Sequence, residues 1–337
     1  MTSVKEFRVE REPTPERPGA GAFVFTDTYS VFDWGRMPDT VARKGASLCT
    51  MGAFNFELLE AEGIPTHYRG VGEEAKSLAE IENPPIRMAI DLVEAPDLPH
   101  EGREYDYETY HETAGGNYLV PLEIVFRNSV PRGSSLRRRY TPSECGLGFE
   151  EWPAERVDLG ESIVEFSTKY EESDRYLPPE EADDIAGKAD LANLKSIARE
   201  VNRVVSEQAR SNEFVHEDGK IECCYIDGEI RVADVVGTFD ENRFSYDGQE
   251  ISKEVLRAYH KRTQPDWVEA VESAKEEAKS QEIADWRTLC ERDPEFLPTE
   301  VVDLASEMYA SGTNAYTGNE WFAAPPVEAV VERVRDL

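Results

Sequence analysis

Three charged residues stand at alternate positions in the segment DGKIE, namely Asp218, Lys220 and Glu222. Successive side chains of a β-strand point to opposite faces, so a strand here would place all three on one face. Such a row beside apolar residues can bind Mg²⁺ through its carboxylates and a nucleotide phosphate through its ammonium group. Taken alone, the pattern also fits the solvent-exposed face of an ordinary hairpin.

A further carboxylate, Asp234, ends the apolar run that follows Asp227-Gly228. Two carboxylates facing each other across a hairpin suit Mg²⁺, which takes one or two protein carboxylates and completes its shell with phosphate and water. A two-residue turn would point Glu222 and Asp234 to opposite faces of the hairpin. A three-residue loop would instead pair Lys220 with Asp234 and place Glu222 and Asp234 on the same face. We therefore predict the three-residue loop, with both carboxylates as metal ligands within roughly 6 Å of each other. A bulge later in either strand would have the same effect.

An arginine and a Gly-Ser loop end the apolar run PLEIVFRNSVPRGSS. The planar guanidinium of Arg127 matches phosphate or carboxylate, and Gly133 lets the backbone beside Ser134 approach an anion. A strand end followed by a solvated basic loop explains the pattern equally well. In a chain this acidic, further arginines nearby strengthen the anion-binding interpretation: Arg132, Arg137, Arg138 and Arg139.

A hydroxyl pair and a lysine, Ser167-Thr168-Lys169, precede an acidic loop that contains Asp174. This combination suits an anionic ligand, although an ordinary strand end accounts for it too. The five histidines are scattered, and no Ser/His/Asp or Cys/His nucleophile is discernible. GxGxxG and Walker-A patterns are absent as well. We therefore assign no residue as a nucleophile.

The elements that must position these residues follow from apolar periodicity. Strands are expected over 21–27, 86–93, 119–127, 220–226 and 229–236, and residues 96–116 are expected to form a polar insertion loop. Helices are expected over 46–62, 190–211, 253–259, 266–280, 299–309 and 327–334. This order predicts an α+β fold with antiparallel sheets and two lobes around a cleft. We divide it into an N-terminal, ATP-binding lobe (1–120), a central lobe with the substrate and metal sites (121–264) and a helical C-terminal extension (265–337).

The net charge is −32, from 69 acidic and 37 basic residues spread over both halves of the chain. Such a surface repels itself at low salt and stays soluble where salt screens it, as in the cytosol of an extreme halophile. An acidic mimic that binds a basic partner would tend to concentrate its charge. The sign of the charge disfavours nucleic acid as a partner.

No apolar run is long enough to cross a bilayer, and the N-terminus lacks the apolar stretch of a secretory signal. A cytosolic protein without a membrane partner is therefore expected. The five cysteines form no CxxC pair, which argues for free thiols over a disulfide framework.

Taken in order, seven segments resemble the SAICAR synthetase family (phosphoribosylaminoimidazole-succinocarboxamide synthase). TDTYSVFD, ARKGASL and EAEGIPTHY resemble its TDRxSAFD, xxKGxxL and GIPxHx motifs. PLEIVFRNSVPRGS and STKYEESD resemble PxExxxRxxxxGS and STKxExxxHD, and DGKIE and ADVVGTFDENR resemble DxKxE and xDExxPDxxR. The resemblance covers most of the chain and, with the charge, indicates a haloarchaeal-like member.

The resemblance implies a two-lobed fold, related to ATP-grasp and kinase folds, with ATP in the cleft. The carboxylate of carboxyaminoimidazole ribonucleotide would be phosphorylated by ATP, and the amine of L-aspartate would displace phosphate to give SAICAR. Residue by residue, the implied ATP contacts are Lys5, Lys44, Lys220, Glu222 and Asp234, with Glu222 and Asp234 binding Mg²⁺. The implied contacts of the ribonucleotide are Arg127, Ser134, Lys169, Asp174 and Arg243. Lys220, Asp218 and Asp33 are the implied catalytic residues, with Asp33 and Lys44 on a mobile turn over the site.

Two other functions stay open. A small-molecule kinase of related two-lobed build would share the DxK strand but has no use for the anion sites at Arg127 and Lys169 together. A non-catalytic nucleotide-binding protein is disfavoured by the pair Glu222 and Asp234. The oligomeric state is not fixed by the sequence, and a homo-oligomer is left open.

Overall fold

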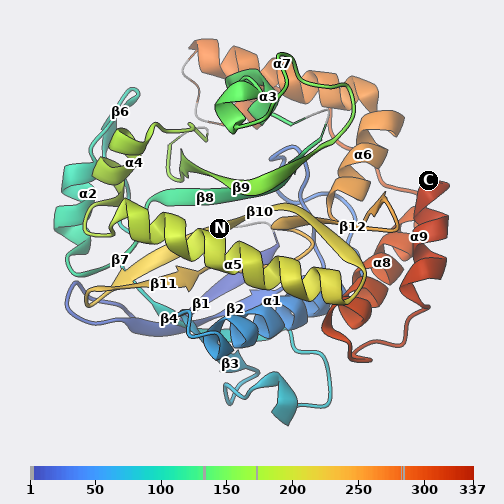
Figure 1. Cartoon of the computed structure of the whole chain (residues 1–337), viewed down its shortest axis with the longest axis horizontal. Coiled ribbons are helices and arrows are strands. Elements are labelled where there is room, and N and C mark those ends of the chain that lie inside the picture. Colours follow the sequence, from blue (N-terminus) through green and yellow to red (C-terminus); the bar gives the residue numbers. More distant parts are fainter. Residues whose placement is uncertain (1–3, 132–133, 172–173, 282, 284) are drawn as a thin grey trace.

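The computed structural model of the 337-residue chain describes residues 4–131, 134–171, 174–281, 283 and 285–337. Within these residues, two antiparallel sheets are covered and flanked by helices (Figure 1). The expected α+β class, with antiparallel sheets and a helical C-terminal region, is confirmed. The division into three regions stays a prediction.

The first sheet is four-stranded and belongs to the N-terminal third of the chain. Its strands in spatial order are β1 (Lys5–Arg11), β2 (Gly19–Phe25), β4 (Arg87–Leu92) and β3 (Tyr68–Val71). Helix α1 (Lys44–Ala61) packs on this sheet and also against α8 (Thr299–Thr317) near the C-terminus. Because α1 has protein on several sides, most of its residues are buried rather than a single apolar stripe.

The second sheet is built around the 13-residue strand β10 (Phe214–Ile226). The first half of β10 pairs with β12 and β8, and its second half with β11 and β7. The surrounding strands are β7 (Asn117–Leu119), β8 (Leu122–Val130), β9 (Val157–Thr168), β11 (Glu229–Ala233), β12 (Asn242–Tyr246) and β13 (Gln249–Glu250). The length of β10 lets one strand run past several partners and carry side chains to two separate places.

Helix α5 (Leu191–Ser211) covers this sheet by packing on β8, β9 and β10. Its buried residues recur at helical spacing, as in Leu194, Ala198, Val201 and Val205. The side chain of Asp190 accepts a hydrogen bond from the Asn193 N–H at 2.8 Å and so caps the first turn.

The prediction of a three-residue loop in the β10–β11 hairpin is wrong. Ile226 pairs directly with Glu229, so Asp227 and Gly228 form a two-residue turn. Both turn residues have positive φ, 50° at Asp227 and 94° at Gly228. An Asp-Gly pair adopts such angles readily, and the resulting twist matches that of the strands, which explains the shorter turn.

Residues 96–116 are not the structureless loop expected from their polarity. They contain a small hairpin, β5 (His100–Glu101) with β6 (Glu104–Tyr105), followed by helix α2 (Tyr107–Ala114). The Asp106 side chain caps α2 by accepting a hydrogen bond from the Thr109 N–H at 2.9 Å. Helix α2 is polar because it lies at the surface, where it gives little apolar periodicity.

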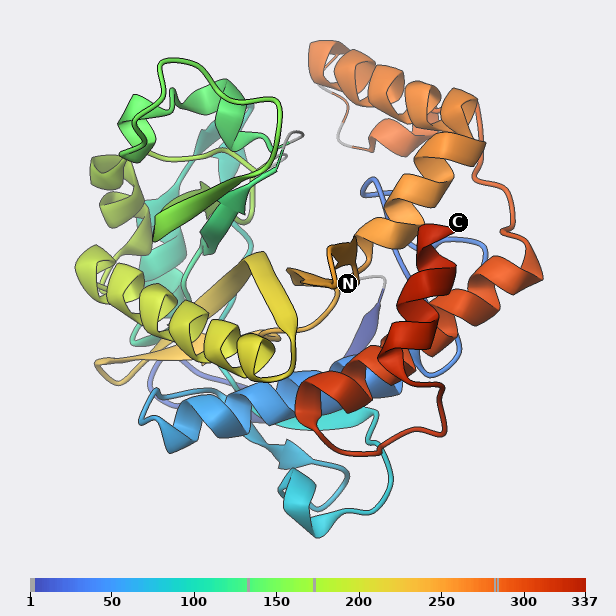
Figure 2. The same cartoon turned by 45° about the vertical axis from the view of Figure 1, so that its right-hand side comes forward.

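The C-terminal helices lie on one side of the molecule, opposite the side formed by the ends of β8 and β9 with α3 (Leu136–Arg139) and α4 (Pro179–Ala186) (Figure 2). They are α6 (Glu254–Thr263), α7 (Pro265–Gln281), α8 and α9 (Val327–Arg335). Helix α8 runs eight residues beyond the expected end at 309. Gly312 lies within this extra length, and a Cβ there would approach the Phe239 ring to 2.8 Å, so its small size serves packing.

A continuous hydrophobic core runs from Phe23 of β2 to Val334 of α9 and includes residues from all three expected regions. All five cysteines are free thiols, as expected. In the part of the chain that the structure describes, no helix is both long and apolar enough to cross a membrane.

Candidate active site

Two cavities lie along β10. The first, which we call the apolar-walled cavity, has a volume of about 380 Å³ and is walled by residues such as Phe23, Ile90 and Leu119. The second, which we call the charged cavity, has a volume of about 540 Å³ and is lined by arginines, lysines and carboxylates, among them Arg127 and Arg243. The first therefore suits a flat apolar group and the second an anion.

The alternating row on β10 reaches both cavities. Asp218 and Lys220 line the charged cavity, and Glu222 lines the apolar-walled cavity. The strand period of two places the three side chains on the same face, as the sequence indicates. Lys220 therefore lies between the two cavities, where a group transferred from one ligand to another would pass.

Two lysine–carboxylate pairs lie in the apolar-walled cavity. Lys5 of β1 is ion-paired with Asp234, and Lys169 after β9 with Glu222. Burial, together with the nearby Asp234 carboxylate, raises the pKa of Glu222. Burial alone would raise the pKa of Asp234 too, but the Lys5 ammonium outweighs it and lowers that pKa. Two buried carboxylates that oppose each other's ionisation make a site that favours an added cation.

The backbone at Asp234 explains how this carboxylate joins Glu222 despite the two-residue turn. Strand β11 ends at Ala233, and Asp234 has a left-handed φ of 60° that turns the chain at that point. The ring of the buried His67, whose pKa burial lowers to about 4, donates from Nε2 to the Asp234 carbonyl oxygen at 3.1 Å. The sequence therefore indicated the right pair through the wrong register, and their separation of roughly 6 Å stays a prediction.

The charged cavity is backed by a chain of alternating arginines and carboxylates. Arg127 donates from Nε to Glu165 at 2.8 Å and from Nη1 to Asp218 at 3.2 Å. Arg243 donates from Nε to Asp218 at 2.8 Å, and Arg139 from Nη2 to Glu165 at 2.5 Å. Three arginines on two buried carboxylates leave one net positive charge here.

The donors of Arg127 are largely engaged within the protein. Its Nη2 also donates to the Tyr176 hydroxyl at 3.1 Å, so three of the five N–H groups of a guanidinium have protein acceptors. The side chain is 5% exposed, and the carboxylates of Glu165 and Asp218 raise its pKa despite burial. Arg127 is thus held in one orientation, and within the described residues two of its N–H groups are left for a ligand. Asp218 fixes both Arg127 and Arg243.

Lys220 is surrounded by carboxylates. Its Nζ lies 2.6 Å from Glu123 and 3.5 Å from Glu241. Burial lowers the pKa of Lys220, but Glu241 and Glu123 more than compensate and raise it well above its ordinary value. The side chain is a permanent cation, suited to binding phosphate and unsuited to accepting a proton.

Lys44 requires a correction, because it lies in the interior and not on a mobile turn. It is the first residue of α1 and is fully buried, with its Nζ 2.6 Å from Asp240. Asp240 also accepts a hydrogen bond from the Tyr309 hydroxyl of α8 at 2.6 Å, and burial lowers the pKa of Lys44. Lys44 therefore does not reach either cavity directly but holds Asp240 in the wall of the charged cavity.

Of the two aspartates Asp174 and Asp33, Asp174 is the one that belongs to the charged cavity. Asp174 lines it, and partial dehydration, with the carboxylates of Glu123 and Asp33, raises its pKa. Asp33 is exposed and lies 2.5 Å from Lys275 of α7. Phe32 and Asp33 both have left-handed φ, 56° and 58°, which marks this turn as strained backbone of the kind found at functional sites.

Ser134 lies in the wall of the charged cavity, and its Oγ accepts a hydrogen bond from the Leu136 N–H at 3.3 Å. Gly133 and Arg132 lie outside the described residues. The following arginines are less available than their sequence suggested. Arg137 donates to the carbonyl oxygens of Val130 and Glu155, which makes it a brace for its own loop.

The structure adds residues that the sequence analysis missed, and they line the charged cavity: Glu123, Asp240, Glu241, Lys253, Glu254 and Arg257. Glu123 could have been found, because it alternates with Arg127 on β8. Lys253 and Arg257 could not, because only the packing of α6 brings them to the cavity. Among the described residues, no group of three or more His, Cys, Asp or Glu gathers to hold a metal, so Glu222 and Asp234 remain a pair.

Comparison with known proteins shows which family the chain resembles. A family model described as SAICAR synthetase matches residues 14–277. A putative phosphoribosylaminoimidazole-succinocarboxamide synthase of Archaeoglobus fulgidus is 40% identical over 100% of this chain and 99% of its own. The phosphoribosylaminoimidazole-succinocarboxamide synthase of Thermoplasma acidophilum is 27% identical over 89% of this chain and 93% of its own.

Solved structures share the fold. The SAICAR synthase of Saccharomyces cerevisiae complexed with SAICAR has a TM-score of 0.64 at 20% identity, covering 95% of this chain and 94% of its own. A SAICAR synthetase (Type-2) in complex with ADP has a TM-score of 0.55 at 21% identity, covering 88% and 99%. The chain therefore belongs to the SAICAR synthetase family, the ATP-dependent ligases of purine biosynthesis.

Proposed function

We propose that this chain condenses carboxyaminoimidazole ribonucleotide with L-aspartate, at the expense of ATP, to give SAICAR, ADP and phosphate. The observation that carries the proposal is the pair of cavities joined by Asp218, Lys220 and Glu222 of one strand. The relatives with that activity in their names support it, as do the solved relatives in complex with ADP and with SAICAR.

ATP would occupy the apolar-walled cavity. Phe23 and Ile90 offer an apolar surface to the base, and Lys5 and Lys169 offer cations to the phosphates. A lysine is a flexible point charge, so each can exchange its carboxylate for a phosphate oxygen as the ligand enters. Lys220 would meet the transferred phosphoryl group, which matches its place between the cavities.

The ribonucleotide would occupy the charged cavity. Arg127, Ser134 and Arg243 would hold its phosphate, with Asp174 nearer to the reacting end. Lys169, which the sequence analysis assigned to this ligand, lines the other cavity instead. Asp218 would act by fixing the two arginines, because both of its carboxylate oxygens already accept hydrogen bonds from them. Asp33 would approach Asp174 at the mouth, where aspartate enters.

The reaction needs positioning more than covalent help from the protein. An oxygen of the substrate carboxylate attacks the γ-phosphorus of ATP, and the bond to ADP breaks to leave an acyl phosphate. The amine of aspartate then attacks the acyl carbon, phosphate leaves with the electron pair, and the nitrogen gives up its proton. Lys220 supplies positive charge next to the oxygens that carry negative charge in both steps.

Glu222 and Asp234 fit a magnesium ion. They are oxygen donors in one cavity, and each lowers the other's tendency to ionise, which a divalent cation would relieve. When bound there, Mg²⁺ would neutralise charge on the ATP phosphates. We also propose that the enzyme is cytosolic.

An assay of ADP release with each substrate omitted in turn tests the proposal. Sustained ADP and phosphate release should require ATP, ribonucleotide and L-aspartate together. Sustained ADP release without aspartate, with no phosphate, would instead identify a small-molecule kinase. No turnover with any combination would leave a nucleotide-binding protein.

A further inference from the structure

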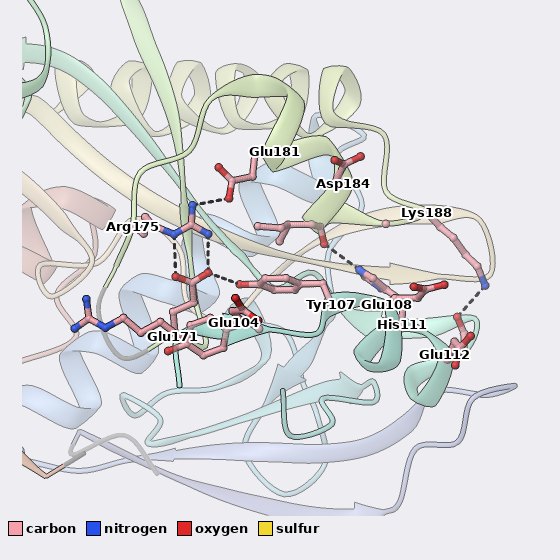
Figure 3. Close-up of a pocket in the computed structure, with 15 residues that line it drawn as sticks. Glu104, Tyr107, Glu108, His111, Glu112, Glu171, Arg175, Glu181, Asp184 and Lys188 are labelled. Carbon is pink, nitrogen blue, oxygen red and sulfur yellow. Dashed lines mark hydrogen bonds and ion pairs between the residues drawn. The ribbon is translucent and has the colours of Figure 1, made fainter. Parts of the chain in front are cut away.

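A third cavity, of about 980 Å³, lies between helix α2 of the 96–116 insertion and helix α4. It shares no lining residue with the apolar-walled cavity or the charged cavity. Residues of α2 and of the loop between β9 and α4 line it together. Figure 3 shows the Glu171 carboxylate of this loop between the guanidinium of Arg175 and the hydroxyl of Tyr107 from α2. We call the described residues 168–171 and 174–176 the β9–α4 loop.

The β9–α4 loop touches all three cavities. Lys169 lines the apolar-walled cavity, Asp174 and Tyr176 line the charged cavity, and Glu171 and Arg175 line the third cavity. Its ends are tied together, because the Thr168 N–H donates to the Arg175 carbonyl at 3.0 Å and the Arg175 N–H to the Thr168 hydroxyl at 3.1 Å. Fixing Glu171 and Arg175 therefore fixes where Lys169 and Asp174 point.

Two tyrosines of α2 hold the loop from the insertion side. The Tyr107 hydroxyl donates to Glu171 Oε1 at 3.0 Å. Tyr110, three residues later and so on the same helix face, is fully buried, with its ring centroid 5.8 Å from that of Tyr170. The insertion thus contacts two consecutive residues of the loop.

The second anchor comes from α4. Arg175 grips Glu171 with two parallel hydrogen bonds, 2.8 Å from Nη2 to Oε1 and 3.0 Å from Nε to Oε2. Its Nη1 reaches Glu181 of α4 at 2.5 Å. Such a bidentate pair fixes orientation as well as distance. The Glu171 side chain is 8% exposed, and it accepts the two hydrogen bonds from Arg175 as well as the one from the Tyr107 hydroxyl.

We propose that the 96–116 insertion is a positioning device for the reaction, in which Tyr107, through Glu171 and Arg175, sets the loop that presents Lys169 and Asp174 to the two substrates. This inference rests on the proposed function. Tyr107, Glu171 and Arg175 touch no substrate in this account and act only through the loop.

The test compares Tyr107→Phe with Tyr246→Phe. Each change removes one tyrosine hydroxyl from a glutamate, and the control bond, from Tyr246 to Glu328 at 3.0 Å, lies away from both reaction cavities. Tyr107→Phe should raise the ribonucleotide KM about fivefold, with a smaller change in kcat. Loss of one hydrogen bond to a charged group is worth about 10- to 150-fold, and only part of this effect reaches the substrate, because Tyr107 acts through the loop. Tyr246→Phe should leave both constants unchanged at a similar Tm.

Amide hydrogen exchange of the ligand-free protein gives a readout independent of activity. Exchange within 168–171 and 174–176 should accelerate in Tyr107→Phe and in Glu171→Gln, but not in Tyr246→Phe. Unchanged exchange there, or a ribonucleotide KM equal to that of the control, overturns the proposal. If the wild-type protein forms no product, the proposed function fails, and the exchange result alone decides whether the insertion positions the loop.

Discussion

The apolar-walled cavity and the charged cavity share one strand but neutralise their buried charges in different ways. In the first, Lys5 and Lys169 each pair with one carboxylate, Asp234 and Glu222. In the second, arginines and carboxylates alternate in a continuous chain from Arg139 through Glu165, Arg127 and Asp218 to Arg243.

The difference indicates what each cavity does when a ligand arrives. Lysine is a compact charge on a flexible stem, so its ion pairs can rearrange around a polyphosphate and a cation. A guanidinium held on two or three sides cannot move far, so the charged cavity keeps its shape and offers prepared donors. The first cavity is suited to a nucleotide whose phosphate is transferred, and the second to a substrate that must stay in place.

The largest effect is expected at Asp234. Asp234→Asn removes a buried carboxylate that pairs with Lys5 and, in our proposal, binds the metal. We expect kcat to fall by about 10²- to 10³-fold, as on loss of one group that stabilises transition-state charge. Steady-state kinetics over a range of Mg²⁺ concentrations would measure it. Glu229→Gln, at an exposed site on the same hairpin, is the control and should retain activity.

Salt should screen the charges of the protein surface much more than the buried ion pairs of the apolar-walled cavity. The charge of −32 is spread over the chain, whereas the pairs of Lys5 and Lys169 are largely buried and poorly screened. Multimolar KCl should therefore stabilise the fold, and a gain of about 3 kcal/mol would raise Tm by roughly 4 °C for a chain of this length. Thermal unfolding in 50 mM and 3 M KCl checks this. An equal or higher Tm at low salt would refute the halophilic interpretation.

Arg127→Ala tests the fixed arginine chain. The ribonucleotide KM should rise about 10- to 150-fold, which corresponds to about 1.5–3 kcal/mol for one charged fork, while the ATP KM changes little. Because Asp218 and Glu165 lose a partner, Tm should also fall. Arg203→Ala, on the exposed face of α5, controls for the loss of an arginine. A change confined to the ATP KM would assign Arg127 to the other cavity.

The smallest effect is expected at Glu250 of β13, whose ionisation should make the stability of the fold depend on pH. Burial raises the pKa of its carboxyl to about 7, above the ordinary value of 4.5, so the folded state binds a proton that the unfolded state has lost. Stability should thus fall as pH rises from about 4.5 to 7 and then level off. Glu250→Gln should remove this fall and gain about 1–3 kcal/mol at pH 8, measured by urea unfolding. An unchanged pH profile in the variant would contradict the assignment.

Local sequence pattern predicted the elements that carry the site, most clearly α5, whose buried residues recur at helical spacing. It failed where the outcome depends on backbone angles or long-range packing. The left-handed φ of Asp234 reversed the effect of the Asp-Gly turn, and no side-chain pattern encodes it. Lys44 was expected on a mobile turn over the site, but its burial depends on Asp240 and on Tyr309 of a helix more than 250 residues away.

Some of the site residues could likewise be predicted from local sequence pattern, and others could not. The alternation of Asp218, Lys220 and Glu222 was enough to bring them to one face, and Glu123 could have been added by the same rule. Assigning them to two cavities required the fold, because Lys5 reaches Asp234 only through the pairing of β1 with β2 and the packing of the first sheet beside the second. The insertion gave no signal, because its role lies in the contacts of Tyr107 and Tyr110.

Direct binding measurements on two variants test the division into two cavities most simply. Isothermal titration of Asp234→Asn and Arg127→Ala with Mg²⁺–ADP and with carboxyaminoimidazole ribonucleotide gives four dissociation constants to compare with wild type. We predict a crossed pattern, in which Asp234→Asn weakens mainly ADP binding and Arg127→Ala mainly ribonucleotide binding. If both variants weakened the same ligand by similar factors, the two cavities would be one site and the account would be wrong.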